Sequence, residues 1–330
     1  MVLDFPVAIA AAPLLSFVLS FFSILWLIKR KAGWGLDHPN ERSLHIMPVP
    51  RTGGLGLLSS VIVTWLCFSI EIPPIIWAGT GLLVVISLLD DIRHVPVWGR
   101  LLIHTFAAVA FSVVFLLTAY GWLIALGAMA AVIWMCNLYN FMDGSDGLAG
   151  GMTVIGFGYY GLFACLAGDS NFAVINFSIA AAALAFLLHN FHPARIFMGD
   201  AGAIPLGFLA ATLGILGWLN KLWSLWVPLL IFSPFIADAT VTLIKRLMRG
   251  ERIWQAHREH YYQRMVQSGL GHRNTALWGY ALMLAAGGSA VWAGRQDLPA
   301  QGWTAMVWSG SYLLFMFIAD RNQKNQSNRG

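Results

Sequence analysis

Five aspartates stand at the edges of apolar stretches of this 330-residue chain, which holds only 15 acidic residues. Two of them are adjacent, in the motif LLDDIRHVPVWGR. Adjacent carboxylates repel each other unless a cation compensates, and hard carboxylate oxygens suit Mg²⁺, with Mn²⁺ as a substitute. Solvated loop carboxylates are the simpler alternative. We predict a cation-dependent site built from five candidate catalytic residues: Asp90, Asp91, Asp143, Asp146 and Asp200.

The second motif is NLYNFMDGSDGLAGG, at residues 137–151. It places Asn137, Asn140, Asp143 and Asp146 at three-residue intervals and contains no Lys or Arg. On a helix or helical turn this spacing gathers the four side chains toward one side. The segment is therefore predicted to bind a cation or a cation-bridged ligand.

The third motif, NFHPARIFMGDAG, ends where another apolar stretch begins. Asp200 is followed there by two small residues, Ala201 and Gly202. The backbone N–H groups at the start of a helix can support a phosphate. This segment is predicted to contribute both a carboxylate and an anion-binding backbone.

Two basic segments could hold the anion. The longer one, at residues 245–274, carries His257, Arg258, His260 and Arg264. Histidine and arginine recognise phosphate and nucleotide groups well, which is the favoured interpretation. A solvated basic loop is one alternative, and a Zn²⁺ site on the two histidines is another. The shorter segment places Arg42 and Arg51 ahead of paired glycines and is a weaker candidate of the same kind.

Asp238 differs from the other aspartates because it lies inside an apolar stretch. An ionisable group within a membrane span is a functional candidate by default. Asp238 is accordingly predicted to help bind substrate. The alternative is that it is a structural partner of a neighbouring helix.

The elements that position these residues are predicted to be membrane helices. The chain is 58% hydrophobic and 11% charged, against about 25% charged residues in a typical soluble domain. Eleven apolar runs approximate the ~20 residues that cross a bilayer as a helix, and none alternates as a barrel strand would. The prediction is one all-α, membrane-embedded domain over residues 1–330, with spans at 5–28, 52–70, 75–89, 101–119, 122–138, 151–167, 172–189, 201–218, 225–244, 275–293 and 302–319.

The basic residues predict how these spans are oriented. With the N-terminus outside, 18 of the 20 Lys and Arg residues fall in inner segments, and only Lys221 and Arg295 fall outside. Positive charge favours the cytoplasmic side. We expect a multi-pass protein of a bacterial inner membrane, with a periplasmic N-terminus and a cytoplasmic C-terminus. Every motif above except Asp238 then lies in a cytoplasmic loop: 29–51, 90–100, 139–150, 190–200 or 245–274.

Together these features predict a reaction class. Carboxylates with Mg²⁺ and surrounding Arg and His are the equipment of phosphoryl transfer. The membrane setting implies a lipid substrate, and the basic face would attract a soluble anionic donor.

The chain resembles the polyprenyl-phosphate N-acetylhexosamine 1-phosphate transferases, which form glycosyltransferase family 4. The resemblance covers nearly the whole chain. It rests on the pair at Asp90 and Asp91, the NxxNxxDGxDGLA string at 137–149, PARIFMGDAG at 193–202, and the histidine-containing loop near His257. The order of these motifs and the predicted topology agree with it as well.

The resemblance implies a role for each motif. Asp200 and Asp143 would coordinate Mg²⁺, and Asp90 and Asp91 would lie near the lipid phosphate. Asn140 and Asp146 would lie near the nucleotide and the metal. Phe197 could stack on uracil, and the His257 loop would contact the sugar or the diphosphate. An aspartate would serve either as a nucleophile that forms a covalent intermediate or as a base for the lipid phosphate.

In one place the chain departs from this pattern. Family members often carry HHH or HxHH in the last cytoplasmic loop, where this chain has AHREHYY. The variant is similar to the branch that starts O-antigen lipopolysaccharide or other surface polysaccharides, whose donors include UDP-N-acetylglucosamine, UDP-N-acetylfucosamine and UDP-N-acetylquinovosamine. The expected partners are a UDP-N-acetylhexosamine, undecaprenyl phosphate and membrane lipid, without nucleic acid and with a homodimer as one assembly. A transporter of an anionic solute and a polyprenyl-phosphate hydrolase are the rival interpretations.

Overall fold

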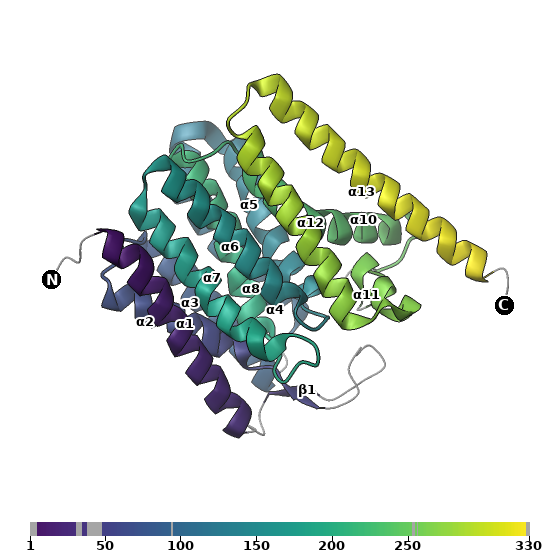
Figure 1. The fold of residues 1–330 in the computed structure, drawn as a ribbon, viewed down its shortest axis with the longest axis horizontal. Helices are drawn as coiled ribbons and strands as arrows, with labels where there is room; N and C mark the ends of the chain where they lie inside the picture. Colours follow the sequence, from purple (N-terminus) through teal and green to yellow (C-terminus); the bar gives the residue numbers. More distant parts are fainter. Residues whose placement is uncertain are drawn as a thin grey trace.

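The protein is described by a computed structural model over residues 5–30, 35–37, 48–93, 95–252, 255 and 257–327, with the side chains of residues 5–6, 37, 91–92 and 322–327 not described. Helices make up nearly all of it (Figure 1). They are α1 (Phe5–Arg30), α2 (Gly53–Cys67), α3 (Pro74–Arg93), α4 (Val97–Ser112), α5 (Thr118–Met142), α6 (Leu148–Ala167), α7 (Ser170–Asn190), α8 (Asp200–Leu219), α9 (Trp226–Ile231), α10 (Ser233–Met248), α11 (Tyr261–Met265), α12 (Gly271–Ala293) and α13 (Leu298–Ser327).

Short irregular elements complete the chain. Two π-helical turns, η1 (Val113–Leu117) and η2 (Val266–Leu270), continue α4 and α11. Two-residue strands β1 (Leu36–Asp37) and β2 (Val49–Pro50) pair antiparallel, with Leu36 opposite Pro50. The prediction of a helical membrane bundle is therefore confirmed in its class.

Each of the eleven predicted spans falls on helical residues. Within the described residues, seven helices are long and apolar enough to cross a membrane, and α2 and most of α3 form shorter apolar helices. One of the seven, Val97–Met142, is 46 residues long and breaks at Gly121, where φ is 79° and ψ is 173°. Glycine adopts this conformation without a steric penalty, so two predicted spans turn back on each other there. The number of crossings and the orientation stay predictions.

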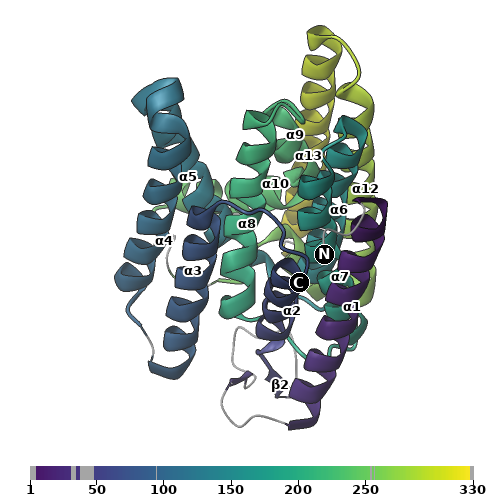
Figure 2. The same cartoon turned by 90° about the vertical axis from the view of Figure 1, so that its left-hand side faces the viewer.

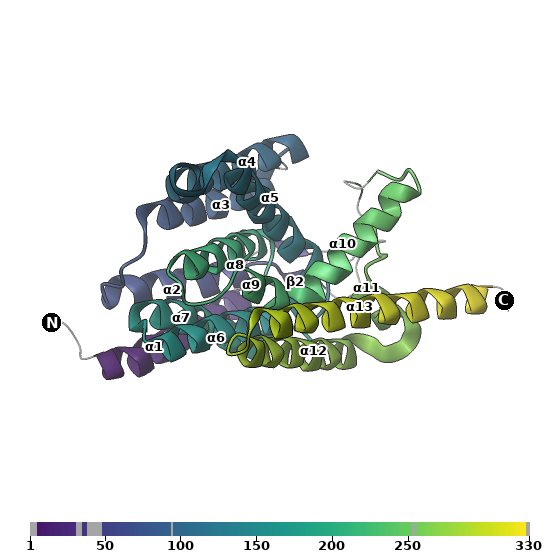
Figure 3. The ribbon, with the colours of Figure 1, turned by 90° about the horizontal axis from the view of Figure 1, so that it is seen from above.

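Helix α8 is the centre of the bundle. It is buried along almost its whole length and packs against α2, α3, α5 and α6 (Figures 2 and 3). Glycines allow these close approaches: a Cβ at Gly207 would collide with the backbone of α5, and one at Gly202 with Gly54 of α2. Small residues replace bulky side chains where membrane helices touch. The carboxylate at the start of α8 is thereby held among three other elements.

The ninth predicted span, 225–244, is not one continuous helix. It divides into α9, which ends at Ile231, and α10, which begins at Ser233 with Pro234 in its first turn. Figure 3 shows α10 leaving the bundle at an angle. Proline lacks the N–H that an unbroken helix needs, and it is well tolerated in a first turn. Hydropathy alone could not place this break, because apolar residues stand on both sides of it.

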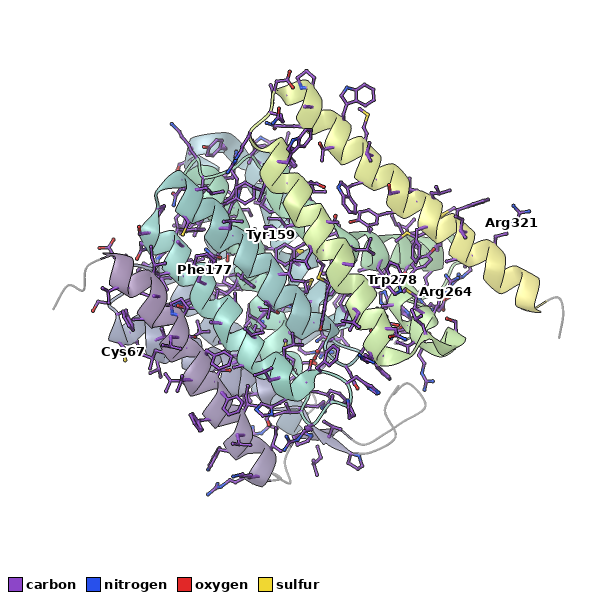
Figure 4. All side chains as sticks on the ribbon, in the orientation of Figure 1. Cys67, Tyr159, Phe177, Arg264, Trp278 and Arg321 are labelled. Atoms are coloured by element: carbon purple, nitrogen blue, oxygen red, sulfur yellow. The ribbon has the colours of Figure 1, made fainter. Side chains whose placement is uncertain are left out.

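Helices α12 and α13 lie on one flank of the molecule, close together where they are joined and diverging toward their other ends (Figure 1). Polar contacts join α13 to the bundle at three levels. Trp226 donates to Gln301 at 2.7 Å, Ser233 hydrogen-bonds to Tyr312 at 2.7 Å, and Asp320 contacts α10 and α11. Most of its other large apolar side chains face outward, as lipid-facing residues do (Figure 4).

Candidate active site

The aspartates of three separate loops meet at one end of the bundle. Asp90 lies in the last turn of α3, Asp143 directly follows α5, Asp146 precedes α6, and Asp200 is the first residue of α8. Because α3 and α5 both pack on α8, their ends bring these carboxylates together. We call this end of the molecule the carboxylate end.

Backbone pairing holds the segment before α8 in place. The Phe197 amide donates to the Pro50 carbonyl at 2.7 Å, and the Gly53 amide donates to the Phe197 carbonyl at 2.9 Å. Gly199 has φ 73°, and a Cβ there would collide with the Arg51 carbonyl. Glycine is thus required immediately before Asp200. Phe197 itself is half-buried beside this pairing.

Arg100 joins two of the predicted catalytic carboxylates. Its Nη1 donates to Asp90 Oδ2 at 2.6 Å and to Asp200 Oδ2 at 3.2 Å. The Asn140 side chain also hydrogen-bonds to Asp200, and Arg51 adds positive charge nearby. Arg100 and Arg51 therefore place two positive charges beside these carboxylates. Arg100 was not among the predicted site residues. It belongs to the same predicted cytoplasmic loop as Asp90, and this shared loop could have indicated it.

Asp143 lies next to the same residues, because its Oδ2 accepts a hydrogen bond from the Gly199 amide at 3.2 Å. Asp143 therefore contacts the backbone at Gly199, the residue immediately before Asp200. Mg²⁺ is commonly bound through one or two carboxylates and several waters. Within the described residues, no three His, Cys, Asp or Glu side chains gather as a closed metal cluster would require. This donor set fits a hydrated Mg²⁺ better than a four-ligand Zn²⁺ site.

Asp146 forms hydrogen bonds with residues of the segment that precedes α8. Its Oδ2 lies 2.6 Å from His192 Nδ1 and accepts from the Ala194 amide at 3.2 Å. The His272 ring stacks on that of His192 with 5.5 Å between centroids, and its Nδ1 lies 2.9 Å from the Ser145 hydroxyl. Neither histidine was predicted, and no local pattern links residues so far apart in the chain. Asp146 thus organises a pair of histidines beside the carboxylate end.

Asp238 holds the start of α11. Its oxygens accept hydrogen bonds from the amides of Tyr261 and Tyr262, each at 2.9 Å, and Oδ1 lies 3.2 Å from His260 Nδ1. A carboxylate at a helix N-terminus satisfies backbone donors that have no helical partner. These contacts are those expected of a structural partner, the alternative to substrate binding. Direct contact with substrate stays a prediction.

The basic loop lies against the second motif. The Tyr262 hydroxyl donates to the Phe141 carbonyl at 2.9 Å, and the Phe141 and His260 rings are 5.9 Å apart. His257 lies 4.8 Å from His260, measured between ring centroids. Burial is the main cause that lowers the pKa of His257 to about 4, and the neighbouring His260 and Arg246 lower it further. His257 is therefore uncharged near pH 7 and serves as a neutral hydrogen-bonding group.

The remaining predicted residues lie in different places. Asn137 turns back to its own helix, donating to the Ile133 carbonyl at 2.7 Å. Arg258 is half-buried in the basic loop, while Arg264 donates to Asp320 of α13 at 2.7 Å. Arg42 and the side chain of Asp91 lie outside the described residues.

The four regularly spaced polar side chains of the second motif do not lie along one face of a single helix. Helix α5 ends at Met142, so Asp143 and Asp146 belong to the turn that follows. Gly147 in this turn has φ 76°, which ends the helical course before α6 begins. The four side chains consequently point to different partners.

Residues 74–218 match the family model described as Glycosyl transferase family 4. This region of the chain is therefore similar to glycosyl transferase family 4. The matched region runs from α3 to the end of α8 and contains Asp90, Arg100, Asp143, Asp146 and Asp200. The convergent carboxylates thus lie within the matched region, while the basic loop and α13 lie beyond it.

Full-length relatives agree with this assignment. The chain is 28% identical over 326 residues to a probable undecaprenyl-phosphate N-acetylglucosaminyl 1-phosphate transferase of Bacillus subtilis, covering 92% of this chain and 88% of the relative. It is 29% identical over 322 residues to a decaprenyl-phosphate N-acetylglucosaminephosphotransferase of Mycolicibacterium smegmatis, with 82% and 78% covered. An undecaprenyl-phosphate alpha-N-acetylglucosaminyl 1-phosphate transferase of Escherichia coli K12 is 26% identical over 274 residues, with 74% and 72% covered. These homologues are phosphotransferases, and the transporter interpretation is not favoured.

Proposed function

We propose that the protein transfers an N-acetylhexosamine 1-phosphate from a UDP-sugar to undecaprenyl phosphate and releases UMP. The supporting observation is the meeting of Asp90, Arg100 and Asp200, with Asp143 alongside, at one end of a membrane bundle. A lipid headgroup and a soluble nucleotide can meet at such an end. Transporter sites usually lie near the bilayer midplane instead.

In this reaction an oxygen of the lipid phosphate attacks the β-phosphorus of the UDP-sugar. The bond from that phosphorus to the bridging oxygen breaks, and UMP leaves with the electron pair. A phosphate monoester has a second pKa of about 6, so the attacking oxygen is largely deprotonated at pH 7. The main obstacle is therefore repulsion between two anions. Arg100 and Arg51 supply positive charge where the two phosphates would meet.

Mg²⁺ is the proposed cofactor, with Asp200 and Asp143 as the residues that would hold it and Mn²⁺ as a substitute. When bound, the ion would neutralise the diphosphate and stabilise the leaving group. Asn140 would orient Asp200 through the hydrogen bond between their side chains. The Gly199 amide does the same for Asp143.

The polyprenyl chain has a suitable place among the membrane helices. An apolar cavity of about 250 Å³ is formed by α5, α8, α9 and α10. Its lining reaches Met135, five residues before Asn140, and Ile236, two residues before Asp238. Because the cavity lies among membrane helices, we propose that it takes isoprene units of the lipid chain at a distance from the headgroup.

The basic loop supports a proposal for the donor and the pathway. We propose that His257, Arg258 and His260 contact the sugar or diphosphate of UDP-N-acetylglucosamine, UDP-N-acetylfucosamine or UDP-N-acetylquinovosamine. The AHREHYY sequence of this loop supports a role in starting O-antigen or another surface polysaccharide. The basic bias of the same segments supports a cytoplasmic active site in the inner membrane.

A donor panel tests the proposal. Purified protein in detergent is incubated with each UDP-N-acetylhexosamine, with and without undecaprenyl phosphate and with Mg²⁺ or EDTA. UMP should form only when lipid phosphate and Mg²⁺ are both present. Phosphate release from the lipid without any UDP-sugar would support the hydrolase instead. No product with any donor would overturn the transferase proposal.

A further inference from the structure

Among the side chains of α13 that the structure describes, Asp320 contacts the basic loop. Asp320 lies toward the end of α13 that approaches α10 and α11, whereas its neighbour Arg321 points away from the bundle (Figure 4). The Asp320 carboxylate accepts from Arg264 Nη1 at 2.7 Å, from the Tyr261 hydroxyl at 3.2 Å, and from Lys245 Nζ. We call these four residues the α13 clamp.

The clamp brings two positive charges to one carboxylate. Lys245 Nζ also donates to the Tyr261 hydroxyl at 2.6 Å, and the Arg264 guanidinium lies 4.7 Å from the centroid of the Tyr261 ring. Without the Asp320 charge, the two cations would repel each other across this ring. Asp320 therefore determines where Tyr261 and Arg264 sit.

Tyr261 connects the clamp directly to the histidines. Its amide is bound by Asp238, and the preceding residue is His260, whose ring meets His257 and Phe141. Helix α11 has only five residues, which is too short to be stable without external contacts. Asp238 holds the backbone of this turn, and the clamp holds its side chains.

We propose that Asp320 is a positioning residue for donor binding, which aligns His257 and His260 from α13 without touching substrate. This inference rests on the proposed function of the basic loop. It also assigns Arg264 to the clamp in place of direct phosphate binding. Since α13 lies beyond the family 4 match, its contribution is a feature of this chain outside the matched domain.

Asp320→Asn tests the clamp, because it keeps the size of the side chain and removes the charge. The KM for the UDP-sugar should rise about tenfold, the scale of one hydrogen bond to a charged group, while the KM for lipid phosphate stays unchanged. Asp320→Glu should restore most of the loss. Asp297→Asn is the matched control, because Asp297 caps the other end of α13 by accepting from the Ala300 amide at 3.1 Å.

The outcomes separate the two proposals. An unchanged KM for the UDP-sugar in Asp320→Asn would overturn the positioning role. So would an equal rise in the KM of both substrates that Asp320→Glu does not reverse. If Asp320→Asn does not purify, Lys245→Gln removes one cation from the same clamp and should raise the donor KM by a smaller factor; an unchanged value would overturn the proposal. Absence of UMP formation by the unaltered protein would instead overturn the proposed function.

Discussion

Replacing Arg100 is the most informative change at the carboxylate end, because this side chain bonds to both Asp90 and Asp200. Arg100→Met keeps the apolar stem and removes the guanidinium. Asp90 and Asp200 would then face each other without their shared cation. Conservative replacement by Lys would leave a single ammonium in place of the planar fork.

The expected magnitude follows from the contacts. Arg100 makes two hydrogen bonds to charged groups, at 2.6 and 3.2 Å. Each bond of this kind is worth about 1.5–3 kcal/mol. The side chains of Arg100, Asp90 and Asp200 are between 14% and 27% exposed, so solvent screens part of this interaction energy. Loss of these bonds lowers stability, and loss of the positive charge beside the reacting phosphates should remove about 2–3 kcal/mol of transition-state stabilisation, or roughly 30- to 150-fold in kcat/KM. Arg100→Lys should lose about tenfold because it retains one bond of two.

The assay is UMP release by purified variants in detergent, with size-exclusion chromatography as the check on folding. Arg93→Gln is the matched control, since Arg93 is an exposed basic residue three positions after Asp90. It should stay within about twofold of the unaltered protein. Wild-type kcat/KM in folded Arg100→Met would refute the reasoning, as would an equal loss in Arg93→Gln.

Three further predictions follow from the metal, the histidines and the topology. EDTA should abolish turnover and Mg²⁺ restore it, and Asp200→Asn should lose nearly all turnover while purifying normally; wild-type rates across Mg²⁺ concentrations would exclude Asp200 as a ligand. Because the pKa of His257 is lowered to about 4, this ring is neutral above that pH, so the donor KM should depend on pH identically in the unaltered protein and in His257→Gln between about pH 5.5 and 8. The prediction would be contradicted if the donor KM of the unaltered protein showed an ionisation near pH 6.5 that His257→Gln lacks. Reporter fusions should report cytoplasm at Gly150 and periplasm at Asp169, at opposite ends of α6; a periplasmic signal at Gly150 would break the orientation.

The helices were predictable because lipid imposes a simple rule on sequence. A span must be apolar along its length and satisfy its own backbone, so each predicted run fell on helical residues. The break between α9 and α10 was not predictable from hydropathy, although Pro234 marks it. The contacts that bring the ends of α3 and α5 onto α8 depend on glycines such as Gly207, whose packing role appears only in three dimensions.

The proximity of the loop aspartates was predictable from the sequence, whereas the partners that they contact were much less so. Scarce aspartates in loops on one predicted face indicated that Asp90, Asp143 and Asp200 would meet. The partners that complete their environments come from distant parts of the chain: Arg100 lies 100 residues from Asp200, and His192 lies 46 residues from Asp146. Sequence spacing reports only neighbours within one element, so such bonds require the tertiary structure.

The exchange of labelled UMP tests the central claim most directly, because it requires the phosphoanhydride chemistry itself. Transfer replaces one phosphoanhydride by another, so the reaction should run in both directions. Purified protein with Mg²⁺, the lipid-linked sugar diphosphate and labelled UMP should yield labelled UDP-sugar, and Arg100→Met should slow this exchange as much as the forward reaction. Forward UMP release without any label returning to UDP-sugar, or solute uptake into sealed vesicles without UMP, would contradict the account.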